Sequence, residues 1–184
     1  MRDLSLHLLD LIQNSVTANA KHVSVELSLD KDGLFTITIT DDGRGMSQEL
    51  LQRVLSPFAT TRTTRKVGLG IPLFQQNARL AGGEVAIRST LGVGTTLTGT
   101  FDTRSIDCLP LGDVPETFAS LVLANPSTPE FSLRCVSPEG RMDFSTEDLR
   151  AQLPDVPLNE PEVFAWITDT LREEIQPILG GITL

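Results

Sequence analysis

One stretch of the sequence, residues 34–46, reads LFTITITDDGRGM. Its first part alternates apolar and polar side chains, which is the pattern of a strand with one buried face. The strand runs directly into Asp41, and Gly43 and Gly45 follow closely. A strand fixes the position of a carboxylate, and glycines let the backbone approach a flat ligand. In isolation, the hexapeptide DDGRGM is better explained as an ordinary Asp-Gly turn. The case for a binding site therefore rests on the flanking sequence.

The sequence before this stretch predicts a helix and a strand. Apolar residues recur at helical spacing over residues 3–19, and Asp10 and Asn14 lie one turn apart on one face of that helix. Residues 22–29 alternate strictly, and the turn Asp30-Lys31-Asp32-Gly33 joins them to residues 34–40 as a hairpin.

The sequence after the stretch predicts two helices and a second hairpin. Ser47 is suited to cap a short helix over 48–55, and Gly68-Leu69-Gly70 precedes a helix over 70–81. Strands are expected at 84–89 and 95–101. Because hairpins and helices are segregated rather than alternating along the chain, the fold class is α+β, a two-layer α/β sandwich.

The composition changes near residue 104, which predicts a boundary between residues 1–104 and 105–184. The first part carries 11 basic and 10 acidic residues, and the second carries 4 basic and 14 acidic residues. After a linker at 105–112, the second part is expected to form a small α-β-β-α-α unit. Its elements are predicted at residues 113–124, 131–136, 141–145, 146–153 and 161–179.

Composition also excludes several classes of function. A net charge of -9 and only 5% aromatic residues disfavour binding to nucleic acid, which needs a basic surface and stacking side chains. No apolar run is long enough for a membrane span, and the N-terminus lacks the pattern of a signal peptide. Cys108 and Cys135 lack metal-ligand spacing. We therefore expect a cytoplasmic protein with two free thiols, and its oligomeric state stays open.

Several polar residues have the chemistry of a magnesium–ATP site. Asn14 offers an amide oxygen to Mg²⁺, and Asp10 is placed to orient or deprotonate a nucleophile near the terminal phosphate. Asp41 is suited to accept a hydrogen bond from the amine of adenine. Thr95 is suited to add a second polar contact to the ligand. The glycines at 68 and 70 would expose helix N-terminal amides to phosphate.

Five motifs, in order over about 100 residues, resemble the ATP-binding domain of the gyrase, heat-shock chaperone, histidine kinase and mismatch-repair ATPase superfamily (GHKL). The segments Asp10–Ala18 and Asp41–Met46 resemble its N-box and first glycine box. The segment Pro57–Arg62 resembles the F-box of histidine kinases, and Gly68–Gly70 resembles the second glycine box. The segments Ala81–Gly83 and Ser89–Thr95 resemble the end of a kinase catalytic domain.

The resemblance implies a Bergerat-type ATP-binding fold, with ATP and Mg²⁺ as cofactors beneath a lid at residues 47–67. It implies that Asn14 binds Mg²⁺ and that Asp10 is the catalytic base. The remaining residues implied to contact the nucleotide are Asp41, Gly43, Gly45, Met46, Thr60, Thr61, Arg62, Lys66, Gly68, Leu69, Gly70 and Thr95.

The sequence departs from the family pattern at three points. Asp10 stands where the family usually has Glu, and Thr17 stands where the kinases often have Lys. The helix with a phospho-accepting histidine, which normally lies upstream, is expected to be absent. His7, His22 and Trp166 are better explained by structural roles. Asp10 is explained either as a catalytic residue or as a solvated helix residue. The acidic second part is explained either as a solvated face or as a surface for a basic partner.

Three functions follow from the resemblance. The leading hypothesis is an ATP-dependent protein kinase, of the histidine- or serine-kinase type, that acts in trans on another protein. The alternatives are a conformational switch driven by ATP and a slow ATPase of the gyrase or mismatch-repair type. The sequence leaves the protein partner and the role of residues 105–184 unidentified.

Overall fold

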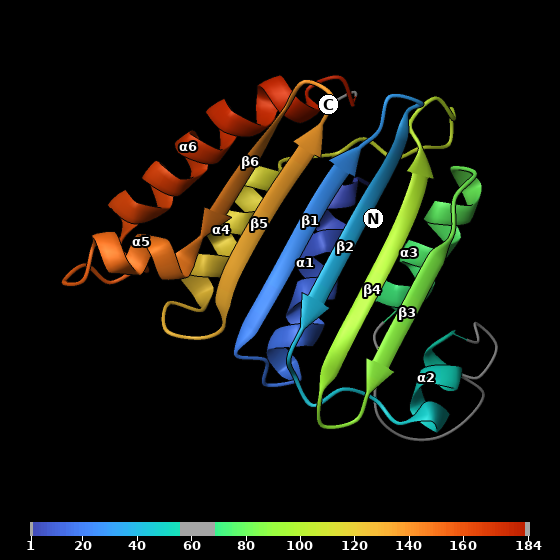
Figure 1. The fold of residues 1–184 in the computed structure, drawn as a ribbon, viewed down its shortest axis with the longest axis horizontal. Helices are drawn as coiled ribbons and strands as arrows, with labels where there is room; N and C mark the ends of the chain where they lie inside the picture. The colour runs from blue at the N-terminus through green and yellow to red at the C-terminus, as the bar shows by residue number, and fades with distance from the viewer. Residues whose placement is uncertain (1, 56–68, 183–184) are drawn as a thin grey trace.

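A computed structural model describes residues 2–55 and 69–182 and has an α+β fold with one six-stranded sheet. The strand order is β3-β4-β2-β1-β5-β6. Figure 1 shows α1, α3 and α4 behind the sheet and α2 beyond one end of it. The predicted fold class is confirmed, because the helices gather on one face of a mixed sheet.

The predicted order of elements is also observed, and the predicted ends agree within about two residues. The first part contains α1 (Leu4–Thr17), β1 (His22–Leu29), β2 (Leu34–Asp41), α2 (Gln48–Leu55), α3 (Gly70–Leu80), β3 (Val85–Thr90) and β4 (Gly94–Asp102). The second part contains α4 (Val114–Ala124), β5 (Glu130–Ser137), β6 (Gly140–Ser145), α5 (Thr146–Gln152) and α6 (Pro161–Leu179). None of the helices in the described ranges has the length and apolar character that crossing a lipid bilayer requires.

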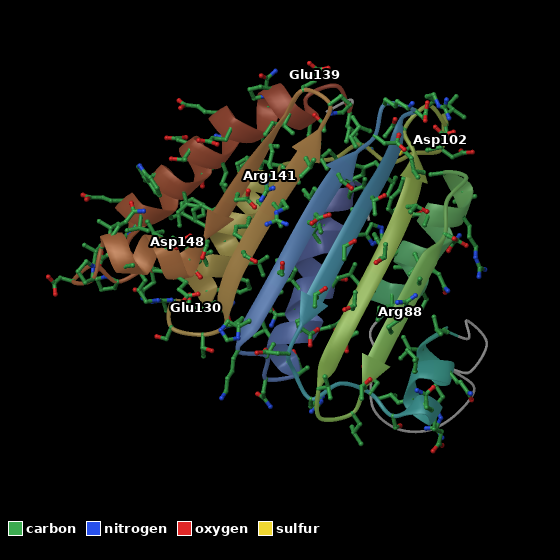
Figure 2. The ribbon with its side chains drawn as sticks, viewed as in Figure 1. Arg88, Asp102, Glu130, Glu139, Arg141 and Asp148 are labelled. Atoms are coloured by element: carbon green, nitrogen blue, oxygen red, sulfur yellow. The ribbon has the colours of Figure 1, made fainter. Side chains whose placement is uncertain are left out.

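Alternation along the strands gives the sheet one apolar and one polar face. Phe35 and Ile37 of β2 are fully buried beneath the helices, and burying each such side chain stabilises the fold by about 1.5–3 kcal/mol. On the open face, Thr38 and Thr98 are partners across β2 and β4. Figure 2 shows polar side chains such as Arg88 and Arg141 on this face. The sheet therefore forms its core on the helical side only.

A close approach between α3 and the sheet sets the position of α3. A Cβ atom at Gly99 of β4 would lie 2.4 Å from Phe74 Cε1, so only glycine leaves room for that ring. Phe74 packs edge-on against Phe101, with ring centroids 5.3 Å apart. His7 of α1, fully buried, lies 2.7 Å from the Asn77 side chain of α3. These contacts hold α1 and α3 side by side.

The acidic second part continues the sheet of the first part. Strand β5 pairs in parallel with β1, with Val25 opposite Leu133. The linker also binds the start of α1, because the Leu4 and Ser5 N–H groups donate to the carbonyls of Pro110 and Leu111, each at 2.9 Å. The predicted boundary at residue 104 therefore separates two parts of one continuous sheet.

Candidate functional site

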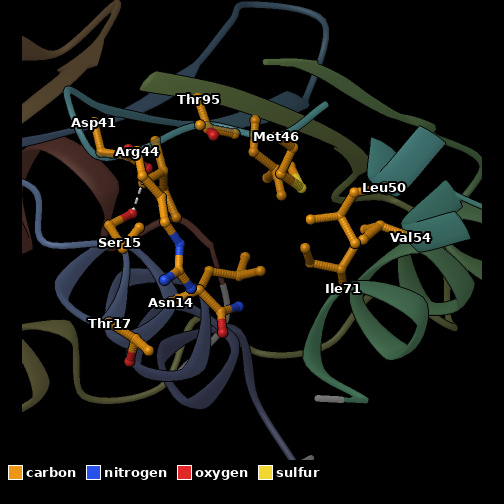
Figure 3. Close-up of a pocket in the computed structure, with 15 residues that line it drawn as sticks. Asn14, Ser15, Thr17, Asp41, Arg44, Met46, Leu50, Val54, Ile71 and Thr95 are labelled. Carbon is orange, nitrogen blue, oxygen red and sulfur yellow. Dashed lines mark hydrogen bonds between the residues drawn. The ribbon is translucent and has the colours of Figure 1, made fainter. Parts of the chain in front are cut away.

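A cavity of about 260 Å³ opens beside α1, at the end of the sheet where β2 finishes and β4 begins (Figure 3). It is lined by Leu11, Asn14, Ser15, Thr17, Ala18, Ile39, Asp41, Arg44, Gly45, Met46, Leu50, Val54, Ile71, Thr95 and Leu97. Asn14, Asp41, Gly45, Met46 and Thr95 were predicted from the sequence as site residues. The fold brings these five together in one cavity.

Asp41 is held rigidly at one end of the cavity. It is the last residue of β2 and lies opposite Thr95 of β4. Ser15 Oγ donates a hydrogen bond of 2.7 Å to Asp41 Oδ2, and the Gly43 N–H donates one of 2.9 Å to Oδ1. A carboxylate has about four acceptor positions. Asp41 can therefore still accept a hydrogen bond from a ligand in the cavity.

Thr95 belongs to a second group of hydroxyls behind the cavity. The hydroxyls of Thr95 and Ser89 lie 2.8 Å apart, and Ser89 Oγ also donates to the Gly94 carbonyl at 3.1 Å. Ser89 Oγ in turn accepts the Met46 N–H at 2.8 Å. These contacts connect β3, β4 and the loop after β2, so Thr95 and Met46 have fixed positions relative to Asp41.

The glycines of this loop are required by its close packing. Gly45 has φ +63°, and a Cβ atom there would lie 2.0 Å from the Thr90 carbonyl oxygen. Gly43 is buried and does not line the cavity, and its Cβ would lie 2.9 Å from Ala18 Cβ. Both positions therefore exclude larger residues and bring the loop against α1 and the turn between β3 and β4.

Asn14 and Thr17 lie on α1, away from the carboxylate end, and both are exposed. Arg44 extends across the cavity towards Asn14 (Figure 3). Leu50 and Val54 of α2 and Ile71 of α3 form an opposing apolar wall. The cavity thus has an acidic end, an end with an amide and a guanidinium, and apolar sides.

Asp10 lies outside the cavity lining, one turn before Asn14. Its carboxylate borders the start of α3, because a Cβ atom at Gly70 would be 3.4 Å from Asp10 Oδ2. Leu69 is the N-cap residue of α3, is exposed, and provides no side-chain hydrogen bond to the helix. Gly70 therefore borders Asp10, and neither Leu69 nor Gly70 belongs to the described lining of the cavity.

The remaining predicted nucleotide contacts lie outside the described residues. They are Thr60, Thr61, Arg62, Lys66 and Gly68. The same holds for the segment that resembles the F-box and for the part of the predicted lid after Leu55. These residues stay predictions.

Four polar residues at or behind the cavity were not predicted as site residues: Ser15, Thr17, Arg44 and Ser89. Ser15 is buried on the core side of α1, and its hydroxyl donates a hydrogen bond to Asp41. The role of Ser89 could have been predicted from the sequence. Ser89 follows Ile87 at strand spacing, so it is a polar residue on the buried face of β3 and needs a hydrogen-bond partner there. Arg44 has no such signal, because exposed arginines are common in turns.

Neither histidine belongs to the cavity lining. His7 is fully buried, and burial lowers its pKa, so the ring is a neutral core group. His22 is exposed and pairs with Asp42, with its Nδ1 2.8 Å from Asp42 Oδ2. Although desolvation raises the pKa of Asp42, hydrogen bonds from the His22 side chain and from the His22 and Lys21 N–H groups lower it to about 2. This pair joins the loop after β2 to the start of β1.

The chemistry of the lining fits an adenine nucleotide. Apolar sides suit the faces of a planar ring, and the fixed carboxylate of Asp41 suits an amino group. Within the described ranges, no three His, Cys, Asp or Glu side chains gather to hold a metal ion. Mg²⁺ usually needs only one or two protein ligands beside water and phosphate oxygens, so the exposed amide of Asn14 fits that ion.

Comparison with known proteins gives a family match over the first part of the chain. Residues 2–105 match the family described as histidine kinase-, DNA gyrase B-, and HSP90-like ATPase. The match includes every predicted site residue, from Asp10 to Thr95.

Similar curated proteins include sensor kinases. The histidine protein kinase DivJ of Caulobacter vibrioides is 34% identical, over 52% of this chain and 17% of DivJ. The sensor histidine kinase ZraS of Escherichia coli is 28% identical, over 50% of this chain and 20% of ZraS. The chain thus spans a fifth or less of the length of these relatives.

A solved structure described as the N-terminal domain of a DNA repair protein has a similar fold. It matches with a TM-score of 0.52 and 15% identity, over 79% of this chain and 52% of that one. The share of this chain that is covered exceeds the part matched by the family, so the similarity of fold extends beyond residue 105.

Proposed function

We propose, from the premise that this chain belongs to the family of histidine kinase-, DNA gyrase B- and HSP90-like ATPases, that it is a protein kinase acting in trans. In this proposal it binds Mg–ATP in the cavity of Figure 3 and transfers the terminal phosphate to another protein. Membership of the family implies ATP binding by a histidine-kinase-like ATPase domain. The phosphate transfer and its protein acceptor are the proposed part.

One observation carries the proposal: Asn14, Asp41 and Thr95, from α1, β2 and β4, line a single cavity with apolar sides. Asp41 accepts a hydrogen bond from the adenine amine, and its hydrogen bonds to Ser15 and Gly43 keep the carboxylate in place. Asn14 holds Mg²⁺ through its amide oxygen. When bound, the ion neutralises part of the charge on the phosphates.

Asp10 is the group proposed to handle the proton. It lies one turn before Asn14, and its carboxylate borders the start of α3. It accepts a proton from the nucleophile of the partner protein as the bond to the terminal phosphorus forms and the bond to the leaving oxygen of ADP breaks. The similarity to proteins named as histidine kinases supports transfer over simple hydrolysis.

A second candidate function, a conformational switch, is favoured by a different observation. The linker carbonyls of Pro110 and Leu111 accept hydrogen bonds from the first amides of α1, the helix that carries Asn14. Strand β5 also extends the sheet from β1. Nucleotide binding beside α1 would therefore act on residues that the second part contacts directly.

The cellular location forms part of the proposal. We place the reaction in the cytoplasm, where thiols stay reduced. The free state of Cys108 and Cys135 supports this placement, and burial raises the pKa of the Cys135 thiol to about 12.

The test uses the whole chain and ATP labelled on the γ-phosphate, alone and with a cell lysate. Transfer of label to a lysate protein, dependent on added chain and lost with Asn14→Ala, supports the kinase. Free phosphate as the sole product supports a slow ATPase, and bound, unchanged ATP supports the switch. Asn14→Ala protein that still binds Mg–ATP with wild-type affinity would contradict the site assignment.

A further inference from the structure

Arg44 is fixed at its backbone but its side chain has no partner in the described structure. Its N–H donates to the Ala18 carbonyl at 2.9 Å, and its carbonyl accepts the Gly92 N–H at 2.7 Å. Within residues 2–55 and 69–182, no carboxylate lies within ion-pair distance of its guanidinium. The backbone of Arg44 is thus held in place, and its side chain lines the cavity without an ion-pair partner among the described residues.

Among the lining residues that the structure describes, only Arg44 and Asp41 carry a formal charge. Asp41 already accepts hydrogen bonds from Ser15 and Gly43 at its end of the cavity. The Arg44 side chain extends away from Asp41 and towards Asn14, and both Arg44 and Asn14 line the cavity (Figure 3). The two charges thus give the cavity opposite signs at its two ends.

Mg–ATP keeps a net negative charge, so phosphates at the Asn14 end need a further cation in addition to the ion that Asn14 would hold. Asn14 lies in the last turn of α1, and that turn contains no basic residue. The carbonyl groups at a helix C-terminus carry a partial negative charge, which repels an anion. Arg44 offsets this repulsion, and a guanidinium can donate two parallel hydrogen bonds to phosphate oxygens.

We propose that Arg44 binds the phosphate groups of the nucleotide at the Asn14 end of the cavity and makes the site select adenine nucleotides over adenosine. This inference rests on the proposed binding of an adenine nucleotide. A structural alternative is that Arg44 only stabilises the C-terminus of α1 through its charge. The two roles differ in what Arg44→Ala does to affinity.

The experiment measures the affinity of the whole chain for adenosine, ADP and ATP in the presence of Mg²⁺ by calorimetry. We expect Arg44→Ala to weaken ADP and ATP binding by about tenfold or more, the effect of losing one charge-assisted hydrogen bond. Adenosine affinity should stay within about twofold. Arg44→Lys should recover part of the loss, since it restores the charge but not the paired donors.

Arg88→Ala is the matched control, because Arg88 is exposed on the open face of the sheet and does not line the cavity (Figure 2). Its affinities should equal those of the wild type. Equal losses of adenosine and ATP affinity in Arg44→Ala would overturn the inference, as would a lower melting temperature with unchanged affinities. If the wild type binds neither adenosine nor ATP, the proposed function itself fails. If it binds both equally, only the role of Arg44 fails.

Discussion

Ser15 and Asp41 are joined by a hydrogen bond of 2.7 Å between the Ser15 hydroxyl and Asp41 Oδ2. Ser15 lies on α1 and is buried, while Asp41 ends β2 at the cavity. The bond thus links the helix that carries Asn14 to the carboxylate proposed to recognise adenine. It sets both the distance and the orientation between these two parts of the site.

Ser15→Ala should weaken the site without abolishing it. The loss of one hydrogen bond to a carboxylate is expected to lower the free energy of unfolding by about 1.5–3 kcal/mol. Adenosine affinity should fall about fivefold, since Asp41 is then held by the Gly43 N–H alone. Calorimetry and urea denaturation measure the two effects. Ser24→Ala, an exposed serine of β1, is the control, and an unchanged adenosine affinity in Ser15→Ala would rule out this role.

Gly45→Ala should destabilise the fold far more than Gly92→Ala. Both glycines have positive φ, +63° and +79°, but a Cβ at Gly45 would lie 2.0 Å from a carbonyl oxygen, whereas Gly92 faces open space. We expect a loss of about 2–4 kcal/mol at Gly45 and about 1 kcal/mol at Gly92. Urea denaturation of both variants measures these values, and equal losses would show that packing against Thr90 is unimportant.

Asp10→Asn should separate catalysis from binding. Asp10 does not line the cavity, so the affinity for Mg–ATP should change by less than about threefold. Loss of the proton acceptor should slow consumption of ATP by about a hundredfold or more. Turnover of labelled ATP under saturating conditions is the measurement, with the remote, exposed Asp155→Asn as control. Wild-type turnover by Asp10→Asn would remove Asp10 from the mechanism.

Asp42 should contribute stability that depends on pH. Its pKa is lowered from 3.8 to about 2 in the folded protein, so the folded state favours the ionised carboxylate. The contribution is therefore fully present above pH 3.8 and is lost as the pH falls towards 2. Asp42→Asn should lower the free energy of unfolding at pH 7, and the difference from wild type should shrink as the pH falls through this window. Urea denaturation between pH 7 and 3 measures it, and a constant difference would contradict the assignment.

The helices and strands could be predicted from the amino-acid sequence, because their signals are local. Alternation identified the strands, helical spacing and caps identified the helices, and the order of hairpins and helices indicated the α+β class. The motifs also placed Asn14, Asp41 and Thr95 as site candidates, and the structure brings these three to one cavity.

The junction between the two parts of the chain and the full lining of the cavity could not be predicted, because both depend on tertiary packing. The parallel pairing of β1 with β5 joins segments about 100 residues apart, and no local pattern specifies such a partner. The same holds for the hydrogen bond from Ser15 to Asp41 and for the direction of the Arg44 side chain towards Asn14. Each depends on where separate elements pack, and packing is set by the whole core rather than by neighbours in sequence.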